Sequence, residues 1–295
     1  MTASDGAVLA FDLGGTRVKS GIVHGDAISD LSVDEAGADP MAVVLDRAQH
    51  LLGAQPCAAV GLCVPGLVDD GVLVSLPGKH AGLEGTDLRR TLSGALGLPA
   101  YVANDAIAYA VGEATAGAAL GHHRAAVITI GTGVGVGVVE DGRPLGGGPL
   151  GGGLMSGMIP IAAGSEFADT NGQHGTIEAL CAAARLLSGE AATRHETVPE
   201  LLASARTGEP TAVAAVDRWR ADFSRAVTAI AHAHAPSVVV VGGGPLSDDD
   251  LVLDGVERAV NDRLFGAYRV MVRRARLGDA AALHGIAHLA RQLAA

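Results

Sequence analysis

The chain has 295 residues, of which 48% are hydrophobic and 18% charged. This is the composition of a folded globular protein, it excludes a largely disordered one, and the length is sufficient for two lobes with a core each. The formal net charge of −11 argues against a nucleic-acid binder that relies on a basic surface, and no run of 18 apolar residues predicts a membrane span.

The N-terminal residues and the cysteines fit a protein of the cytoplasm. The sequence MTASDGAVLAFDLGG has no basic stretch followed by an apolar segment and a cleavage site, so we expect no signal peptide. The three cysteines, Cys57, Cys63 and Cys181, form no C-x-x-C pair, and their odd number does not suggest a disulfide framework. We therefore expect three reduced thiols.

The first half of the chain predicts strands that alternate with helices. Gly14-Gly15 joins the first two strands as a hairpin turn, and Asn104-Asp105 is a good helix N-cap because such side chains accept backbone N–H groups. In chain order, the expected elements are strands at 8–12 and 18–23, a third short strand before residue 33, a helix at 41–52, strands at 58–64 and 100–103, and a helix from 104 to about 118.

The middle of the chain repeats the strand–turn–strand pattern of its beginning. The later elements are strands at 127–130 and 134–139, a third strand after residue 142, a glycine-rich irregular stretch at 146–175, helices at 176–187 and 211–234, a strand at 237–241, a helix at 249–263, a strand at 269–273 and a helix at 279–293. The alternation favours an α/β architecture, and the recurrence favours two lobes of similar topology.

Four glycine-rich turns each follow an apolar strand, at 12–16, 131–135, 146–153 and 242–244. Glycine lets the backbone approach a ligand closely and direct its N–H groups at phosphate oxygens, whereas any single turn could also be an ordinary one. The chain has neither G-x-x-x-x-G-K-[ST] nor a dinucleotide-binding G-x-G-x-x-G that opens a helix. We expect strand–turn–strand hairpins to hold the phosphates.

Asn104 and Asp105 lie at a strand-to-helix junction. Phosphoryl transfer needs a carboxylate that orients the attacking hydroxyl and accepts its proton, and Asp105 is well placed for that role. The residues alone leave a plain helix N-cap open as the alternative.

With these stretches in view, the chain resembles the ROK family of sugar kinases and sugar-responsive repressors, within the actin/hexokinase-like superfamily. The matching stretches occur in family order: AFDLGGTRVKSGIV, GLCVPGLVD, VANDAIAYAVGEA, ITIGTGVGVGVV, VVVVGGGPLS and LGDAAALHGIAHLA. The resemblance implies a two-lobed, actin-like (ribonuclease H-like) α/β fold with its active site in the interlobe cleft. It further implies an N-terminal lobe of residues 1–112 plus 280–295 and a C-terminal lobe of residues 113–279.

The resemblance also assigns roles to matched positions. It implies ATP and Mg²⁺ as cofactors, with the Mg²⁺ near Asp12, a small sugar-like substrate, and a homodimer. Its first phosphate motif is Asp12, Gly14, Gly15, Thr16 and Lys19; its second is Gly131, Thr132 and Gly133; its adenosine motif is Gly242, Gly243 and Gly244; its substrate contacts are Gly66, Asn104 and Asp105, with Asp105 as catalytic base.

The chain departs from the family where that family binds zinc. Met155 and Met158 stand where a sugar-binding Glu and a zinc-binding His are usual, and the family's three cysteines in the following loop are absent. Because a structural zinc site needs four N or S ligands, we expect none, and we expect packing or polar contacts to hold the loop. Glu178 is retained as a substrate contact, and His174 is a second candidate. We expect His122, His123, His232 and His234 not to bind metal.

These observations predict an ATP-dependent kinase that phosphorylates a primary hydroxyl of a hexose, an amino sugar or a cyclitol. A sugar-binding or regulatory protein that keeps the fold without turnover is the alternative. The substrate, and whether polyphosphate can replace ATP, stay open.

Overall fold

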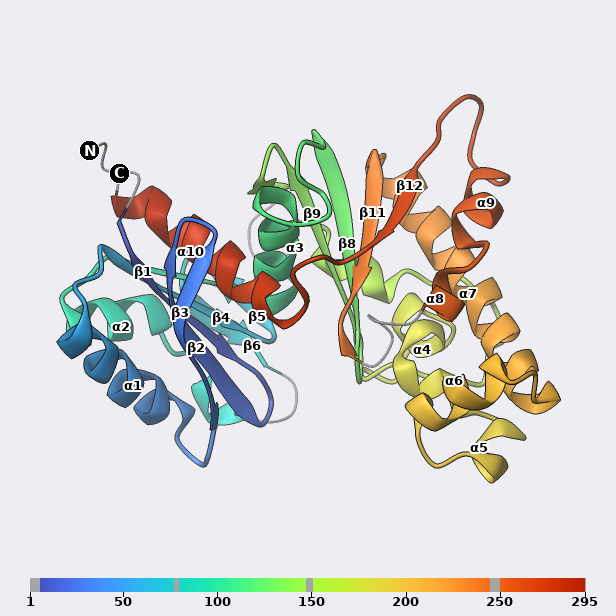
Figure 1. Cartoon of the computed structure of the whole chain (residues 1–295), viewed down its shortest axis with the longest axis horizontal. Coiled ribbons are helices and arrows are strands. Elements are labelled where there is room, and N and C mark those ends of the chain that lie inside the picture. The colour runs from blue at the N-terminus through green and yellow to red at the C-terminus, as the bar shows by residue number, and fades with distance from the viewer. Residues whose placement is uncertain (1–5, 77–79, 147–150, 245–249, 295) are drawn as a thin grey trace.

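The computed structural model describes residues 6–76, 80–146, 151–244 and 250–294. Two five-stranded sheets stand side by side, with two helices between them and further helices on their outer faces (Figure 1).

The first sheet has the strand order β3-β2-β1-β4-β7, in which β1, β4 and β7 are parallel and β2 is antiparallel to both its neighbours. Side chains alternate along β1, so Leu9 and Phe11 pack on the outer helices while Val8 and Ala10 face the second sheet. The elements are β1 (Val8–Leu13), β2 (Arg17–His24), β3 (Ala27–Glu35), β4 (Ala59–Val64) and β7 (Ala100–Asn104), with the outer helices α1 (Pro40–Ala54) and α2 (Leu88–Leu96).

The second sheet repeats this arrangement in the order β10-β9-β8-β11-β12. Its outer face carries a larger core centred on α7, where Trp219 stacks on Phe223. The elements are β8 (Arg124–Ile130), β9 (Val134–Glu140), β10 (Arg143–Pro144), β11 (Val238–Gly242) and β12 (Met271–Arg274), with α4 (Ile177–Cys181), α5 (Ala191–Arg194), α6 (Val198–Arg206), α7 (Pro210–His234), α8 (Asp250–Leu253) and α9 (Val256–Asn261).

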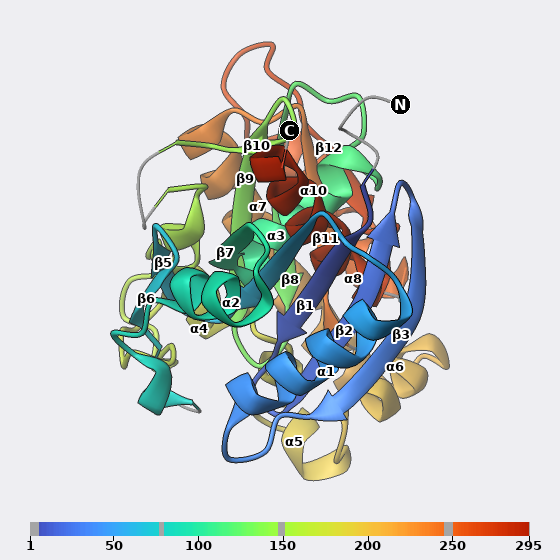
Figure 2. The same ribbon diagram turned by 90° about the vertical axis from the view of Figure 1, so that its left-hand side faces the viewer.

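The helices α3 (Asp105–Thr115) and α10 (Ala281–Ala294) form the layer between the sheets (Figures 1 and 2). A Cβ at Gly112 would lie 2.0 Å from the carbonyl oxygen of Ala281, and one at Gly285 would lie 1.7 Å from that of Ala108, so the helices cross closely only because both residues are glycine. Helix α10 packs on β1 and β4, and α3 packs on β8 and β9. The proposed lobe boundary at residue 112 falls within α3, and the division stays a prediction.

The chain passes between the two sheets twice, and the buried carboxylate of Glu113 joins both passages. Its oxygens accept the backbone N–H groups of Ala118 (2.7 Å), Arg276 (3.1 Å) and Leu277 (2.8 Å). These donors satisfy a charge that would otherwise be costly to bury. Glu113 therefore links the two connections at the hinge, a role that a glutamate in a helical pattern did not signal.

Two expected helices are interrupted for identifiable reasons. The helix expected at 176–187 ends at Cys181 and resumes as a 3-10 turn, η5 (Ala183–Leu186), because the N–H of Ala183 donates to the carbonyl of Gly131 instead. The helix expected at 249–263 is broken between α8 and α9 by Gly255, whose φ of 72° lies in the left-handed region. Sequence reasoning also missed the hairpin β5 (Leu67–Asp69) and β6 (Val72–Ser75), and the helices α2, α5 and α6.

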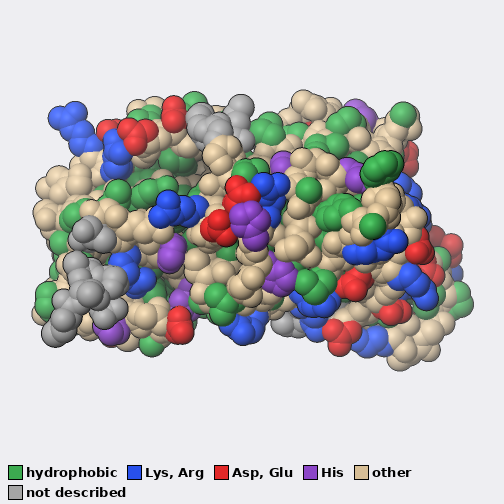
Figure 3. Space-filling view, turned by 90° about the horizontal axis from the view of Figure 1, so that it is seen from above, with side chains coloured by type: hydrophobic (Ala, Val, Ile, Leu, Met, Phe, Trp, Pro, Cys, Tyr) green, Lys and Arg blue, Asp and Glu red, His purple; other side chains and the backbone are tan. Residues whose placement is uncertain are grey.

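The surface carries mixed charge on the face drawn in Figure 3, where Lys and Arg side chains lie among Asp and Glu. Ion pairs among the described residues include Arg124 with Glu140 at 2.5 Å and Arg273 with Glu257 at 2.8 Å. Over the described ranges, no helix is both long and apolar enough to cross a membrane.

Candidate active site

A cleft of about 640 Å³ opens where the strands of both sheets end. Each sheet presents the carboxyl ends of its parallel strands to this region, which is where α/β proteins place their ligands. The expected site residues that line the cleft are Gly15, Gly66, Asp105, Gly131, Thr132, Gly133, Glu178, Gly243 and Gly244. The structure thus brings together parts of three of the four glycine-rich turns, whereas Gly146, Gly151 and Gly152 of the fourth line a different pocket.

Asp105 is the first residue of α3 and projects into the cleft from the floor of the site. Its neighbour Asn104 is the N-cap, since its Oδ1 accepts the N–H groups of Ala106 (2.8 Å) and Ile107 (3.2 Å). Asn104 is thus the N-cap, while Asp105 also accepts the Ala106 N–H at 2.8 Å and lines the cleft. The role of Asp105 as a base stays a prediction. Asn104 also donates from Nδ2 to the carbonyl of Gly66 at 2.8 Å, which ties the junction to the turn after β4.

The environment of Asp105 favours its protonated form. Burial, and next the negative charge of Asp12, raise the pKa of Asp105 to about 7, against a smaller opposing effect of the Ala106 N–H, which donates to Oδ1 at 2.8 Å. A carboxylate with a pKa near neutrality is a competent general base, because it is ionised at physiological pH yet still takes up a proton.

Asp12 lies near the end of β1, on the face of the sheet that Val8 and Ala10 also occupy. Burial raises the pKa of Asp12, and the Lys19 ammonium at 3.9 Å opposes that rise. The Cys63 thiol lies 3.4 Å from Oδ1 of Asp12 and also carries a raised pKa through burial. Lys19 turns towards Asp279 at 3.3 Å and does not line the cleft among the described residues.

The two carboxylates fit a bound Mg²⁺. The negative charge of Asp12 raises the proton affinity of Asp105 through like-charge repulsion, which a bound divalent cation would relieve. Magnesium needs only one or two carboxylates in addition to substrate phosphates and water, so a large protein cage is not required. Asp12 is the residue that would hold the ion, whose bound form would neutralise phosphate charge.

Polar contacts of Asp169 organise the loop that replaces the family's zinc-binding segment. Its Oδ1 accepts the N–H groups of Asn171 and Gln173, both at 2.9 Å, and its Oδ2 accepts the hydroxyl of Thr176 at 3.0 Å. Thr176 in turn caps α4, and the loop's Thr170 N–H donates to Oε1 of Glu178 at 3.3 Å. The loop is therefore built around a carboxylate, which sequence reasoning anticipated only as unspecified polar contacts.

His174 lies in the same loop without entering the cleft. Its side chain is exposed, and its Nδ1 lies 3.1 Å from the carbonyl of Ser165. Within the described residues, His174 is not among those that line the cleft, whereas Glu178 is. Its role as a substrate contact stays a prediction.

The next residues are the two methionines that replace the family's Glu and His, and the four histidines that we expect not to bind metal. Met155 is 44% exposed, and the sulfur of Met158 accepts the side-chain N–H of Asn171 at 3.5 Å. The 3-10 turn η4 (Leu154–Met158) that carries both is anchored where Ser156 Oγ meets His234 Nε2 at 2.8 Å. His122, His123 and His232 likewise contact Ser237, Asp141 and the Phe265 N–H. In the described ranges, no three His, Cys, Asp or Glu side chains gather as a metal site, and the absence of zinc stays a prediction.

Four further expected residues are not among the described lining residues of the cleft: Asp12, Gly14, Thr16 and Gly242. The carbonyl of Gly14 lies 3.2 Å from His80 Nε2, and Gly242 ends β11.

Comparisons with known proteins agree with this geometry. The profile of the ROK family matches residues 8–293. The N-acetyl-D-glucosamine kinase of Erwinia tasmaniensis is 28% identical over 95% of this chain and 97% of its own length. The ROK hexokinase of Thermus thermophilus superposes with a TM-score of 0.84 at 30% identity over 97% of this chain and 98% of its own. A ROK family glucokinase from Streptomyces griseus, solved in complex with glucose and AMPPNP, superposes with a TM-score of 0.77 at 26% identity over 97% of this chain and 99% of its own. The fold is thus the two-lobed actin-like one, and the chain belongs to the ROK family as an ATP-dependent sugar kinase.

Proposed function

We propose that this kinase transfers the γ-phosphoryl group of ATP to a primary hydroxyl of a hexose, an amino sugar or a cyclitol, with Asp105 as general base. The observation that carries the proposal is the position of Asp105, which faces a cleft lined by glycine turns and has a pKa of about 7. The hydroxyl oxygen attacks phosphorus, its proton passes to Asp105, and the bond from phosphorus to the β-bridging oxygen breaks to release ADP.

The glycine turns support the assignment of the phosphates to the edge between the sheets. Gly15 comes from the first sheet, Gly131 to Gly133 from the second, and Gly243 and Gly244 follow β11. We assign the phosphates to the first two turns, together with Gly14, Thr16 and Lys19, and the adenosine to the third with Gly242. Mg²⁺ would accompany ATP at Asp12 and supply charge neutralisation.

The acceptor would lie between the first sheet and the loop organised by Asp169. Gly66 and Asp105 approach it from one side, and Glu178 from the other, where its carboxylate can accept hydroxyl or ammonium hydrogens. We assign Asn104 a positioning role through its contact with Gly66, and we keep His174 as a candidate contact at the loop's outer side. A homodimer in the cytoplasm is part of the same proposal.

The test is ADP release from Mg-ATP over a panel of hexoses, amino sugars and cyclitols, with wild type beside Asp105→Asn. We expect one compound to give turnover that the substitution reduces at least a hundredfold. Turnover that survives the substitution would remove Asp105 from the mechanism. Binding of a sugar without turnover of any compound would show that this chain uses the fold for recognition alone.

A further inference from the structure

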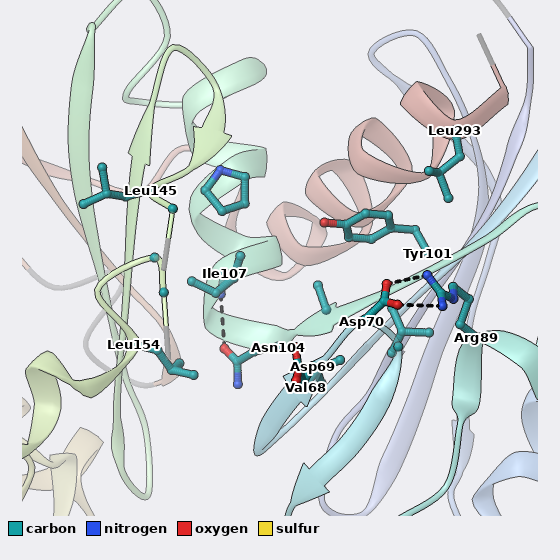
Figure 4. A pocket seen from close by; sticks show the side chains of 17 residues that line it. Val68, Asp69, Asp70, Arg89, Tyr101, Asn104, Ile107, Leu145, Leu154 and Leu293 are labelled. Atoms are coloured by element: carbon teal, nitrogen blue, oxygen red, sulfur yellow. Dashed lines mark hydrogen bonds and ion pairs between the residues drawn. The ribbon is translucent and has the colours of Figure 1, made fainter. Parts of the chain in front are cut away.

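A second pocket of about 450 Å³ lies between the lobes beside α3, separate from the cleft that holds the glycine turns (Figure 4). We call it the side pocket. Its volume is within the range of small-molecule sites. One wall comes from the β5–β6 hairpin, α2 and β7, including Val68, Asp70, Arg89 and Tyr101. The described residues of the opposite wall are Pro144, Leu145, Gly146, Gly151, Gly152 and Leu154.

The side pocket adjoins the acceptor end of the cleft. Asn104 lines the side pocket, while the next residue, Asp105, lines the cleft. Gly66 lines the cleft, and Val68, two residues later, lines the side pocket. The contact from Asn104 Nδ2 to the Gly66 carbonyl lies at this partition. Of the four glycine-rich turns, only the one at 146–153 contributes described residues to the side pocket, through Gly146, Gly151 and Gly152. The turns at 14–16, 131–133 and 242–244, to which the family resemblance assigns the nucleotide, are not among its described lining, so we expect a ligand there to extend the acceptor.

The chemistry of the side pocket suits a sugar ring. Its lining includes the apolar side chains of Ile107 and Leu154, which can pack on the C–H face of a pyranose. Its rim carries a planar ion pair in which Arg89 donates to both oxygens of Asp70, at 2.5 and 3.0 Å. Such paired planar groups have a fixed geometry and can hydrogen-bond hydroxyls at their free edges.

The hydroxyl of Tyr101 is a further polar group of the side pocket. Its phenol points into the side pocket in Figure 4, and no other group in the described part of the chain hydrogen-bonds its hydroxyl. Burial, and next the charge of Asp70, raise the pKa of Tyr101, so the hydroxyl stays protonated as a donor. The rim is rigid because the N–H groups of Leu88 (2.9 Å) and Arg89 (3.3 Å) donate to the carbonyl of Gly71 in the β5–β6 turn.

We propose that the side pocket binds a second sugar ring of the acceptor, so that the enzyme phosphorylates a disaccharide or comparable glycoside in preference to the free monosaccharide. This inference rests on the function proposed above. Tyr101 and Arg89 would set the specificity by hydrogen-bonding the hydroxyls of the second ring.

The experiment compares kcat/KM for a monosaccharide with kcat/KM for its 1→2, 1→3 and 1→4 linked disaccharides that keep a free primary hydroxyl. Wild type is assayed beside Tyr101→Ala, Arg89→Ala and the control Arg90→Ala, which lies on the exposed side of the same helix. We expect one disaccharide to exceed the monosaccharide. Both pocket variants should lower the disaccharide-to-monosaccharide ratio at least tenfold, and Arg90→Ala should leave it within twofold.

Two results would overturn the inference while leaving the kinase assignment in place: turnover of the monosaccharide with none of any disaccharide, or a ratio that Tyr101→Ala and Arg89→Ala both leave unchanged. If no sugar is phosphorylated, calorimetry with the same disaccharides separates the two proposals. Binding that Tyr101→Ala abolishes would keep the side pocket and reject the proposed function, and no binding at all would reject both. Circular dichroism melting curves check that each variant is folded.

Discussion

The two sheets have the same strand order, yet they bring carboxylates to the site differently: Asp12 lies on β1 and Asp105 directly after β7, whereas Glu178 in the second half comes from α4 and not from a strand end. Asp12 lies two residues before the turn of the first hairpin, and Thr129 occupies the corresponding position before the second turn. Asp105 opens the helix after the edge strand of the first sheet, whereas the helix after the edge strand of the second opens with Ala281.

The turn of the second sheet, Gly131-Thr132-Gly133, contains no charged residue, and the carboxylate of Glu178 on α4 lies beside Gly133. A carboxylate there would repel a polyphosphate, whereas the first sheet's carboxylates lie where a cation and a reacting hydroxyl are expected. We therefore expect a carboxylate placed at the end of β8, where Asp12 stands at the end of β1, to weaken ATP binding.

The substitution with the largest expected effect removes the proposed base, Asp105, from the first sheet's side of the site. We expect Asp105→Asn to lower kcat by at least a hundredfold while it keeps the contact with the Ala106 N–H, because a neutral amide cannot accept the proton. In wild type, kcat/KM for Mg-ATP should fall about tenfold per pH unit below pH 7, since protonation of Asp105 removes the base. A wild-type profile that is flat from pH 5 to 8 would contradict this assignment.

The same substitution should stabilise the fold above neutral pH. The folded pKa of Asp105, about 7, exceeds the ordinary value of 3.8, so the unfolded chain loses its proton first and stability declines as pH rises from 4 to 7. At about 1.4 kcal/mol per pKa unit, the penalty is on the order of 4 kcal/mol at most above pH 7. Melting temperatures should therefore separate between wild type and Asp105→Asn at pH 8 and converge below pH 4.

A second test puts a carboxylate into the second turn. Thr129 lines the cleft, so Thr129→Asp would place a negative charge beside the proposed phosphates. We expect KM for ATP to rise at least tenfold, with Thr129→Asn as the neutral control of similar shape. An equal rise in both variants would attribute the effect to the lost hydroxyl, whose contact with the Gly135 carbonyl is 3.4 Å, and not to charge.

A third substitution, Gly131→Ala, has a smaller expected effect and distinguishes close approach of a ligand to the backbone from a change in stability. A Cβ at Gly131 would meet nothing within 4 Å, and its φ is not in the left-handed region, so Gly131→Ala should melt like wild type. If phosphate approaches this backbone closely, KM for ATP should still rise several-fold. Gly53→Ala, equally free of neighbours on α1, is the control. An unchanged KM would move the phosphates away from this turn.

The smallest expected effect concerns the loop that faces the first sheet's carboxylates. Asp169→Ala removes three hydrogen bonds, and we expect a loss of stability of about 1–3 kcal/mol. KM for the acceptor should rise a few-fold because Thr170 no longer restrains Glu178, while KM for ATP should not change. A matching rise in both KM values would mean that the loop supports the whole cleft.

Some parts of the molecule could be predicted from local sequence patterns, and others depend on contacts between distant residues. Strands such as β1 and β11 are continuous apolar runs ended by glycine, and this local pattern suffices to identify them. The break after Cys181 could not be foreseen, because it depends on the Gly131 carbonyl, 52 residues earlier, accepting the N–H of Ala183. The role of Asp169 was likewise hidden, since an aspartate in a glycine-rich loop is common and only its three partners give it one. Family resemblance supplied the assignment of Asp105, whose own pattern is also that of a helix cap.

The position of α10 has a consequence for how the protein is made. The helix covers β1 and β4, which are built from residues near the other end of the chain. During synthesis, the apolar inner face of the first sheet, including Val8, Ala10 and Ala59, therefore stays without this cover until residues 281–294 have left the ribosome. We expect the nascent chain to depend on chaperones over most of its translation and to become protease-resistant late, in one step.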